Sequence, residues 1–334
     1  MLRILHDTKY DFIKHWKTAV IATVAFIVLG LALLVVHKER HGSALNYSVE
    51  FTGGTAIQLH FAQPAPADVV RGAVDQAGFA GAEVTSFGGP NDYMVKAPLK
   101  QGLAATNADS VATSIKTVLA ARLPGNTVTS SEQSVGPRVG DELRNKAITA
   151  ILISFVVTLI YLAFRFEWRF GVAAVVATAH DIFTTMAFLA MLRLEISLTV
   201  VAAILTVIGY SLNDTIIIFD RVRENLKKQR KESLRDVLNR SINETLPRSV
   251  LTHATVLAAT LALLLFAGEV IRPFSWIMAF GVFTGTFSSI YVAGPILLYI
   301  ERRWPRTPDA EHKGTSRALA EGRRRERPSP VGAP

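Results

Sequence analysis

Six long apolar segments limit what this chain can fold into. Each contains roughly 20 mostly apolar residues, the length that an α-helix needs to cross a bilayer core about 30 Å thick. The segments are residues 18–36, 147–164, 170–192, 196–219, 249–268 and 273–300. Because unpaired backbone groups are costly in lipid, such segments cross a membrane as helices. The sequence therefore predicts a polytopic α-helical membrane protein with six transmembrane helices.

The distribution of Lys and Arg predicts the orientation of these helices. Residues 1–17 and the loop at 220–248 are rich in basic side chains, whereas the short loops on the opposite side contain only Arg193 and Arg272. Short loops rich in Lys and Arg stay in the cytoplasm. Both termini are therefore expected to be cytoplasmic, with residues 37–146 outside. The first apolar segment lacks a small-residue cleavage motif and is longer than a typical signal-peptide core, which predicts a retained anchor.

The chain is expected to divide into four parts. These are an N-terminus with the first helix (1–36), an external domain (37–146), five further helices with a charged cytoplasmic connector at 220–248 (147–300), and a basic tail (301–334). The mixed charges of the connector predict a solvated amphipathic helix on the membrane surface. The tail has a composition typical of disorder. Either it contacts anionic lipid or ribosomal RNA, or it is simply a solvated positive tail.

The external segment has the pattern of a small α+β domain. The expected strands are residues 47–61, 82–87, 92–96 and 127–135, and the expected helices are residues 68–77 and 108–123. The order β-α-β-β-α-β predicts a ferredoxin-like domain between the first and second transmembrane helices. Gly53-Gly54 does not match a phosphate-binding loop and predicts a bulge or a close backbone approach.

Composition and motifs argue against several other classes of protein. The net charge of +9 is spread around the apolar segments, as membrane topology requires, so no nucleic-acid partner is expected. The absence of cysteine excludes disulfides and thiolate metal sites. The sequence contains no phosphate-binding loop, nucleophile–base set or metal cluster. We therefore expect neither enzymatic activity nor a cofactor.

Asp214 is the polar residue in the apolar segments that most needs an explanation. It lies six residues before Asp220, or about 9 Å deeper along a helix. A charged group at this depth costs about 2.5–3.5 kcal/mol on insertion scales, so it is kept for a reason. Burial disfavours the charged form of a carboxyl group and a nearby cation favours it, so such a group is able to exchange protons. The alternative is a carboxylate that only holds neighbouring helices together.

Other polar residues are candidates for the same region. Arg248 begins the fifth span, beside the end of the antiparallel fourth span, and either reaches Asp214 or faces the lipid headgroups. His180 and Asp181 lie near the middle of the third span and belong either to a proton path or to buried packing. Adjacent helical residues point about 100° apart, so these two are expected to contact different neighbours and not each other. His253 is a weaker candidate.

The sixth segment carries two features that affect helix packing. Gly281 and Gly285 have the GxxxG spacing, which favours close approach of a neighbouring helix. Gly294-Pro295 predicts a bend near the end of the segment, because proline cannot donate a helical hydrogen bond.

Four segments, in the order of the chain, carry a resemblance to a known family. They are VEFTGGT at 49–55, VGPRVGDEL at 135–143, GYSLNDTIIIFDRVREN at 209–225 and NETLPRS at 243–249. Together with the His180-Asp181 pair, they resemble the SecD/SecF family of the protein-export machinery. Two departures are Glu50, where the family usually has Asp, and His253, where Ser is common.

The resemblance implies a function that composition and spacing do not give. It implies a multi-pass protein of the bacterial inner membrane, with residues 37–146 periplasmic, related to RND proton-driven transporters. The implied partners are SecD, the SecYEG channel, SecA, YajC, exported preproteins and membrane lipid. The proton gradient would then drive late steps of protein export. Carried over by position, the proton path comprises Asp214 and Arg248, with His180, Asp181 and Asn213 as neighbours.

Two other functions are compatible with six spans and a buried acid. One is half of an RND-type proton-coupled exporter of lipid or small molecules, which usually has a larger external portion lined by apolar pockets. The other is a non-transporting membrane scaffold, in which Asp214 is only packed.

Overall fold

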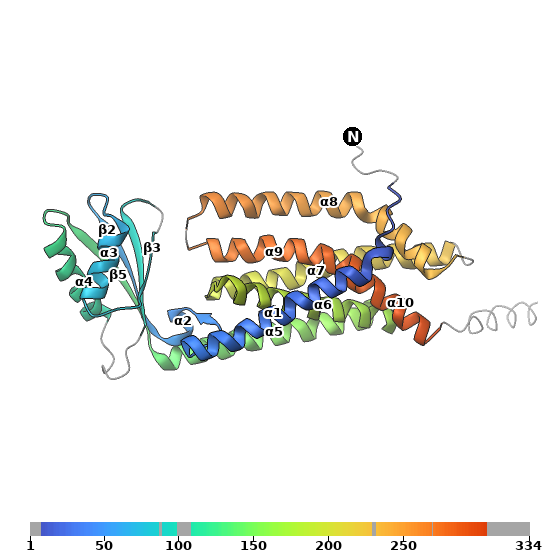
Figure 1. Cartoon of the computed structure of the whole chain (residues 1–334), viewed down its shortest axis with the longest axis horizontal. Helices are drawn as coiled ribbons and strands as arrows, with labels where there is room; N and C mark the ends of the chain where they lie inside the picture. The colour runs from blue at the N-terminus through green and yellow to red at the C-terminus, as the bar shows by residue number, and fades with distance from the viewer. Residues whose placement is uncertain (1–7, 87–88, 99–107, 229–231, 269, 306–334) are drawn as a thin grey trace, which may run out of the picture.

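The computed structural model describes residues 8–86, 89–98, 108–228, 232–268 and 270–305. The molecule is elongated, with a bundle of long helices and a small sheet domain beyond one end of the bundle (Figure 1). Within the described residues, six helices are long and apolar enough to cross a membrane: Phe12–His41, Arg138–Arg165, Trp168–Leu192, Leu198–Lys228, Leu234–Phe266 and Arg272–Arg303. The prediction of six membrane-spanning helices is confirmed.

The bundle has an inner and an outer set of helices. Its elements are η1 (Phe12–His15), α1 (Trp16–His41), α5 (Pro137–Arg165), α6 (Trp168–Leu192), α7 (Leu198–Lys228), α8 (Leu234–Phe266), α9 (Arg272–Ser288), η2 (Ser289–Ala293) and α10 (Gly294–Arg303). Most of the buried residues belong to α6, α7 and α9. The outer helices α1, α5 and α8 expose many large apolar side chains, as expected of surfaces that face lipid.

Small residues allow the inner helices to approach closely. A Cβ atom on Gly281 would lie 2.2 Å from Cγ2 of Val207, and one on Gly285 would lie 2.9 Å from Cβ of Ser211. Both distances are far shorter than real contacts, so α9 packs against α7 only because these residues are glycine. The close packing predicted from the GxxxG spacing is confirmed.

The last span bends as predicted. The helix passes from α9 through a π-helical turn, η2, and α10 then starts at Gly294-Pro295. Pro295 lacks an N–H group, and π-turns and prolines are common causes of helix bends. In Figure 1, α10 leaves the line of α9 and runs outward at the end of the bundle.

The connector at 220–248 differs from the predicted surface helix. Among the described residues, 220–228 form the end of α7 and 234–248 form the first half of α8, so they extend two of the long helices. The first half of α8 packs on η1, where the Asn239 side chain accepts a hydrogen bond from the Phe12 backbone at 2.8 Å. Its apolar residues, Val237, Leu238 and Ile242, belong to the same buried cluster as Ile13. These apolar contacts hold the segment against the bundle.

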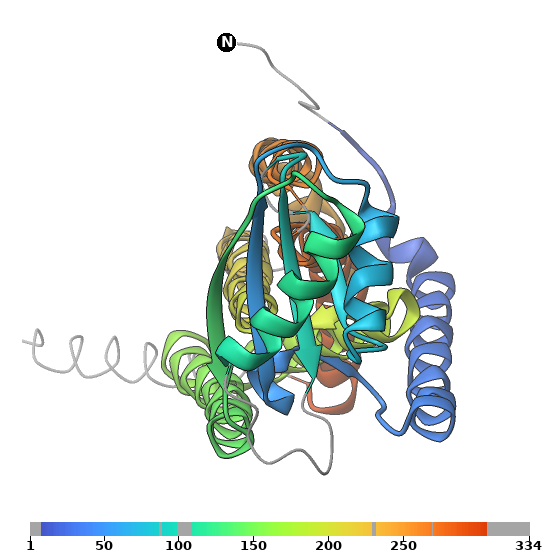
Figure 2. The ribbon, with the colours of Figure 1, turned by 90° about the vertical axis from the view of Figure 1, so that its left-hand side faces the viewer.

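The sheet domain lies between α1 and α5 in the chain. Its strands are β2 (Gly54–Phe61), β3 (Glu83–Ser86), β4 (Asp92–Pro98) and β5 (Val128–Val135), paired antiparallel in the order β3-β4-β2-β5. Helices α3 (Ala67–Gln76) and α4 (Ala108–Arg122) cover one face of the sheet (Figure 2). Ile57, Leu59 and Phe61 of β2 are fully buried beneath them. The elements follow the predicted order, β-α-β-β-α-β.

The first predicted strand, at 47–61, is wrong in its first half. Only β1 (Asn46–Tyr47) is extended there, and it is followed by a helical turn, α2 (Val49–Thr52), before β2 begins. Ser48 caps this turn, because its side chain accepts a hydrogen bond from the Glu50 backbone. Gly53 ends the turn. Polar and apolar residues alternate in this stretch, as they do in a strand, so the sequence pattern does not reveal the helical turn.

Gly53-Gly54 makes the close backbone approach that the sequence predicts. Both residues have a positive backbone φ angle, 77° for Gly53 and 153° for Gly54, which residues other than glycine rarely adopt. Gly140, near the start of α5, packs directly on this turn, since a Cβ atom there would lie 3.0 Å from the Gly53 nitrogen. Two motifs far apart in the sequence therefore meet at the junction between the domain and the bundle.

A second junction joins the sheet domain to the loop between α6 and α7. Lys96 of β4 forms an ion pair with Glu195 of β6 (Glu195–Ile196), and its ammonium group lies 3.9 Å from Glu83. β6 also pairs parallel with β1, with Asn46 opposite Glu195. Burial raises the pKa of Glu195 to about 7, although Lys96 acts in the opposite direction; Glu83 adds to the rise.

Docking of the domain on this loop is predicted to weaken as pH rises. The docked state holds a proton on Glu195 more tightly than a free carboxyl group with its ordinary pKa of 4.5. This contribution to docking is therefore complete below about pH 4.5 and is lost as pH rises through about 7. Because the chain has no cysteine, spin labels at Ser114→Cys and Leu192→Cys report the distance between domain and bundle.

The distance distribution is expected to broaden between pH 6 and pH 8 in this labelled pair. Glu195→Gln removes the titrating group, so the same pair should then give one distribution at both pH values. An unchanged distribution in the parent protein, or a pH response that survives Glu195→Gln, would contradict the assignment.

Candidate functional site

Asp214 lies in the interior of the bundle, near the middle of α7. Its side chain is 4% exposed. One carboxylate oxygen, Oδ1, accepts a hydrogen bond from the Ser249 hydroxyl of α8 at 2.5 Å. The other oxygen, Oδ2, is buried and has no hydrogen-bond partner among the described residues. The carboxyl group is therefore anchored through one oxygen, and the second remains available to a proton or a donor.

A histidine and a tyrosine lie beside this carboxyl group. His253 Nδ1 donates to the Ser249 carbonyl oxygen at 2.5 Å, so Nδ1 carries a proton. The rings of His253 and Tyr210 meet edge to face with centroids 5.3 Å apart. His253 Nε2 and Tyr210 Oη are buried, and neither has a hydrogen-bond partner in the described part of the chain. Nε2 accepts a proton when the ring is neutral and donates one when it is charged.

These groups share one small cleft between α7 and α8. The cleft is lined by Tyr210, Asn213, Asp214, Ile217, Arg248, Ser249, Thr252 and His253. About 10 Å³ of it is open to the centre of a water molecule, which is near the minimum that one water needs. A carboxyl group, an imidazole and a phenol around such a space form a set of groups that can pass a proton.

Arg248 lines the cleft without pairing with Asp214. Its side chain is exposed, and no ion pair between its guanidinium and the Asp214 carboxylate occurs in the structure. Ser249, the next residue, makes the contact with Asp214 that was considered for Arg248. Asn213 also lines the cleft, and its side chain is exposed on the outer surface of α7.

His180 and Asp181 contact each other, so the expectation that they would not pair is wrong. His180 Nδ1 lies 3.1 Å from Oδ1 of Asp181. The other carboxylate oxygen, Oδ2, accepts hydrogen bonds from the hydroxyls of Ser211 on α7 and Ser288 on α9, the latter at 2.8 Å. The two side chains leave the helix in different directions, but packing on α7 and α9 turns the carboxylate back toward the imidazole. Asp181 is 1% exposed, and both of its oxygens have partners.

α7 connects the two buried acids. Ser211, which donates to Asp181, and Asp214 are three residues apart, or about 4.5 Å along the helix axis. Thr215 continues the polar seam through a hydrogen bond of 2.7 Å to Ser289 of η2. The π-turn therefore lies at the polar seam, a common place for such turns in helical proteins. Movement of α7 relative to α9 would change the contacts of Asp181, and movement of α7 relative to α8 would change the contact of Asp214.

The start of α7 is bound to the junction with the sheet domain. Glu50 of α2 accepts a hydrogen bond from the Leu198 backbone N–H at 2.7 Å through its carboxylate. A carboxylate at a helix N-terminus satisfies a free N–H group and interacts favourably with the helix dipole. α2 is followed by Gly53-Gly54 and then by β2, an inner strand of the sheet. A short path of contacts thus joins the domain to the helix that carries Asp214.

Several residues of the site escaped the sequence analysis. They are Glu50, Tyr210, Ser211, Ser249, Ser288 and Ser289. A usable signal existed in α7, where Ser211 and Thr215 stand four residues apart in an apolar helix. Ser249 and His253 repeat that spacing in α8. Polar side chains at this spacing share one helix face, and they indicate a polar seam facing another helix.

Comparison with known proteins gives the family of the chain. Residues 103–303 match the family model for the protein export membrane protein SecD/SecF, C-terminal, and residues 43–65 match the model for the SecD/SecF GG motif. The first match covers α4 to α10, and the second covers β1, α2 and β2. Together the two regions include the contacts of Asp214, Asp181 and Glu50 described above.

Curated relatives cover nearly the whole chain. The protein translocase subunit SecF of Gemmatimonas aurantiaca is 54% identical over 326 residues, which are 96% of this chain and 95% of the relative. The SecF subunit of Vibrio alginolyticus is 39% identical over 317 residues, which are 94% of this chain and 98% of the relative.

Solved structures agree with these matches. The crystal structure of SecDF, a translocon-associated membrane protein from Thermus thermophilus, superposes with a TM-score of 0.75 and 35% identity over 90% of this chain. The crystal structure of SecDF in its super-membrane-facing form superposes with a TM-score of 0.65 and 34% identity over 94% of this chain. The chain spans about 40% of those longer proteins. It therefore belongs to the SecD/SecF family of protein-export membrane proteins, whose members are protein translocase subunits and not enzymes.

Proposed function

We propose that the chain couples proton movement through the α7–α8 cleft to motion of its sheet domain, as an auxiliary subunit in late steps of protein export. One observation carries this proposal. Asp214 is buried, its Oδ2 has no partner in the described residues, and the unpartnered Nε2 of His253 lies in the same cleft. A carboxyl group that only held helices together would use both oxygens, as Asp181 does.

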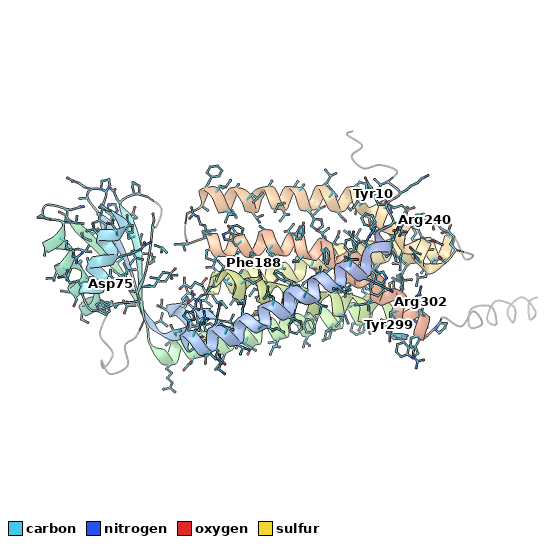
Figure 3. The ribbon with its side chains drawn as sticks, in the orientation of Figure 1. Tyr10, Asp75, Phe188, Arg240, Tyr299 and Arg302 are labelled. Carbon is cyan, nitrogen blue, oxygen red and sulfur yellow. The ribbon has the colours of Figure 1, made fainter. Side chains whose placement is uncertain are left out.

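The orientation in the membrane follows from the positions of the charges. Tyr10, Arg240, Tyr299 and Arg302 lie at the end of the bundle away from the sheet domain, and Phe188 lies between the two ends (Figure 3). Many Arg and Lys side chains gather at that far end, and the positive-inside rule assigns such an end to the cytoplasm. Both termini are then cytoplasmic, in an inner membrane, and residues 37–146 are periplasmic.

The periplasmic domain is inferred to be ferredoxin-like. Its elements run β-α-β-β-α-β, its sheet order is β3-β4-β2-β5, and both helices lie on one face. This order places the first strand of the motif between the third and the fourth, as expected for two interleaved β-α-β units. The uncovered sheet face remains available for contacts with another protein.

A second membrane protein is inferred to cover the α7–α8 cleft. Asn213, Arg248 and Thr252 expose polar groups there at the surface of the bundle, where lipid would leave them without partners. SecD is the proposed partner, because the superposed SecDF proteins contain a further 60% of chain beyond the matched part. SecYEG, SecA, YajC and exported preproteins are the proposed wider assembly.

The proton path is inferred to include Asp214, His253 and Arg248, with Asn213 at its edge. Arg248 lines the same cleft as Asp214 without pairing with it, and we infer that the two groups pair in another state of a cycle. Asp181 of α6, which contacts His180, is bonded to Ser211, about one turn before Asp214 on α7, so this hydrogen bond adjusts when α7 moves.

Asp214→Asn is predicted to abolish the proton-driven step. The amide keeps the shape and accepts the Ser249 hydrogen bond, but it does not titrate. In inverted membrane vesicles that contain the chain and SecD, gradient-dependent completion of preprotein translocation should fall to the level of vesicles without the chain.

Asp220→Asn is the matched control for this experiment. It removes an acid from the same helix, where Asp220 forms a surface ion pair with Arg165 worth about 0–1 kcal/mol. Translocation should then remain near that of the parent protein. Normal gradient-dependent translocation with Asp214→Asn would show that the buried acid is structural.

Glu50→Ala is predicted to loosen the start of α7. Loss of a helix cap costs about 1 kcal/mol, so exchange of the Leu198 amide should rise roughly fivefold. Hydrogen exchange followed by mass spectrometry of the peptide at 196–201 measures this change. Glu39→Ala, which removes an exposed carboxylate from α1, should leave that peptide unchanged. Equal exchange in the Glu50→Ala variant and the parent protein would contradict the proposed link.

A further inference from the structure

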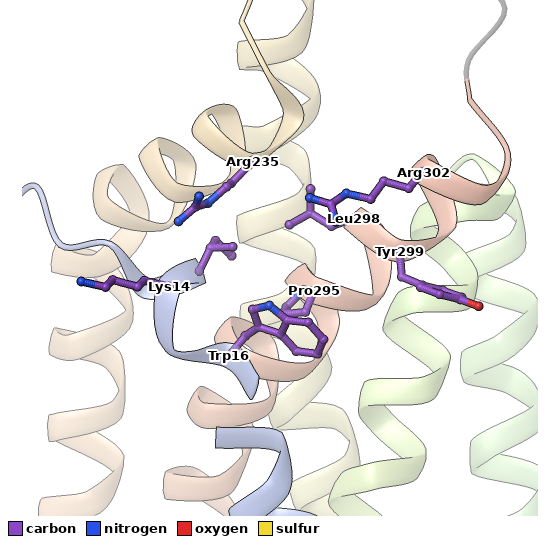
Figure 4. Close-up of a pocket in the computed structure, with 8 residues that line it drawn as sticks. Lys14, Trp16, Arg235, Pro295, Leu298, Tyr299 and Arg302 are labelled. Atoms are coloured by element: carbon purple, nitrogen blue, oxygen red, sulfur yellow. The ribbon is translucent and has the colours of Figure 1, made fainter. Parts of the chain in front are cut away.

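A cationic pocket lies at the end of the bundle away from the sheet domain. It has a volume of about 290 Å³ and lies between η1 with the start of α1, the first half of α8, and α10 (Figure 4). Its lining residues are Ile13, Lys14, Trp16, Arg235, Pro295, Leu298, Tyr299 and Arg302. The bend at Pro295 turns α10 away from the line of α9, which opens the space between α10 and α8.

Three basic side chains lie around this pocket without enough acid to neutralise them. Arg235 pairs with Asp11, with 3.0 Å between Nη2 and Oδ2. Lys14 and Arg302 have no ion-pair partner among the residues that the structure describes. Glu301, the acid next to Arg302 in α10, lies 3.5 Å from Arg169 and does not line the pocket. In Figure 4, Arg302 extends from α10 toward the space beside α8, whereas Lys14 extends away from Arg302. Like charges around a concave site attract an anion.

The remaining wall of the pocket is apolar and aromatic. Ile13 and Pro295 are buried, and Leu298 and Trp16 are half-buried. Tyr299 is 69% exposed and lies at the outer edge of α10. Trp and Tyr are enriched at the headgroup level of membranes, and Lys and Arg at the cytoplasmic side attract anionic lipid. A ligand that suits this pocket therefore has both an anionic group and an apolar chain.

We propose that this pocket binds an anionic phospholipid, with the phosphate between Arg235 and Arg302, where the flexible Lys14 side chain joins them after it rotates, and an acyl chain along Trp16 and Leu298. A free phosphate ion shares the headgroup chemistry, but it would leave the apolar wall unused. The bound lipid joins η1, α8 and α10. Arg235 and Ser249 belong to the same helix, α8, with Pro247 between them, so the lipid binds the segment of α8 that leads to the contact with Asp214. The site is independent of any proton path.

The test is native mass spectrometry of the full chain with palmitoyl-oleoyl phosphatidylglycerol, with phosphatidylcholine as the neutral lipid. Lys14→Gln with Arg302→Gln should weaken phosphatidylglycerol binding roughly 30-fold, as expected for the loss of two interfacial cations. Lys17→Gln with Arg303→Gln removes the same charge from exposed positions outside the pocket. That control should bind phosphatidylglycerol within about twofold of the parent protein.

A charge-retaining variant, a neutral lipid and inorganic phosphate distinguish the remaining explanations. Lys14→Arg with Arg302→Lys retains both charges and should retain binding, which separates charge from misfolding. Equal weakening by the pocket and control variants would reduce the effect to general surface charge and would overturn the proposal. Equal affinity for phosphatidylcholine would also overturn it. Full displacement of the lipid by inorganic phosphate at equal concentration would assign the pocket to a free anion instead.

Discussion

A carboxyl group inside an apolar helical bundle must be hydrogen-bonded, paired or protonated, and this requirement separates the two buried acids of the chain. Asp181 has His180, Ser211 and Ser288 around it, so its charge is held by fixed donors. Asp214 has one donor, Ser249. The first environment suits a structural carboxylate, and the second suits a group that gains and loses a proton. The difference arises from the hydroxyl residues on the facing helices.

α7 connects both acids to the rest of the molecule. It provides Asp214 and the Ser211 contact to Asp181, and it packs on α9 through Gly281 and Gly285. Its first residue is bound by Glu50, which precedes the Gly53-Gly54 turn into the sheet. The cationic pocket lies at the opposite end of the bundle, and the first half of α8 forms part of its wall through Arg235. The Asp214 cleft, the junction with the sheet domain and the cationic pocket thus all involve α7 or its neighbour α8.

The sequence was sufficient for features that depend on local composition. The spans follow from length and hydropathy, Asp214 stands out as a lone acid in an apolar segment, and Gly281 with Gly285 indicates close packing. Features that depend on packing could not be predicted. Whether Ser249 or the adjacent Arg248 faces α7 depends on the rotation of α8. The contact between His180 and Asp181 depends on donors from two other helices, and the first half of α8 is held against the bundle by contacts with η1.

The central claim is that Asp214 changes its protonation during function. Infrared difference spectroscopy of the protein in lipid, titrated over the stable pH range, measures this directly through the C=O stretch of protonated carboxyl groups. The account predicts a pH-dependent band that disappears in Asp214→Asn and persists in Asp181→Asn. A titrating band that survives Asp214→Asn, or its absence from the parent protein, would contradict it.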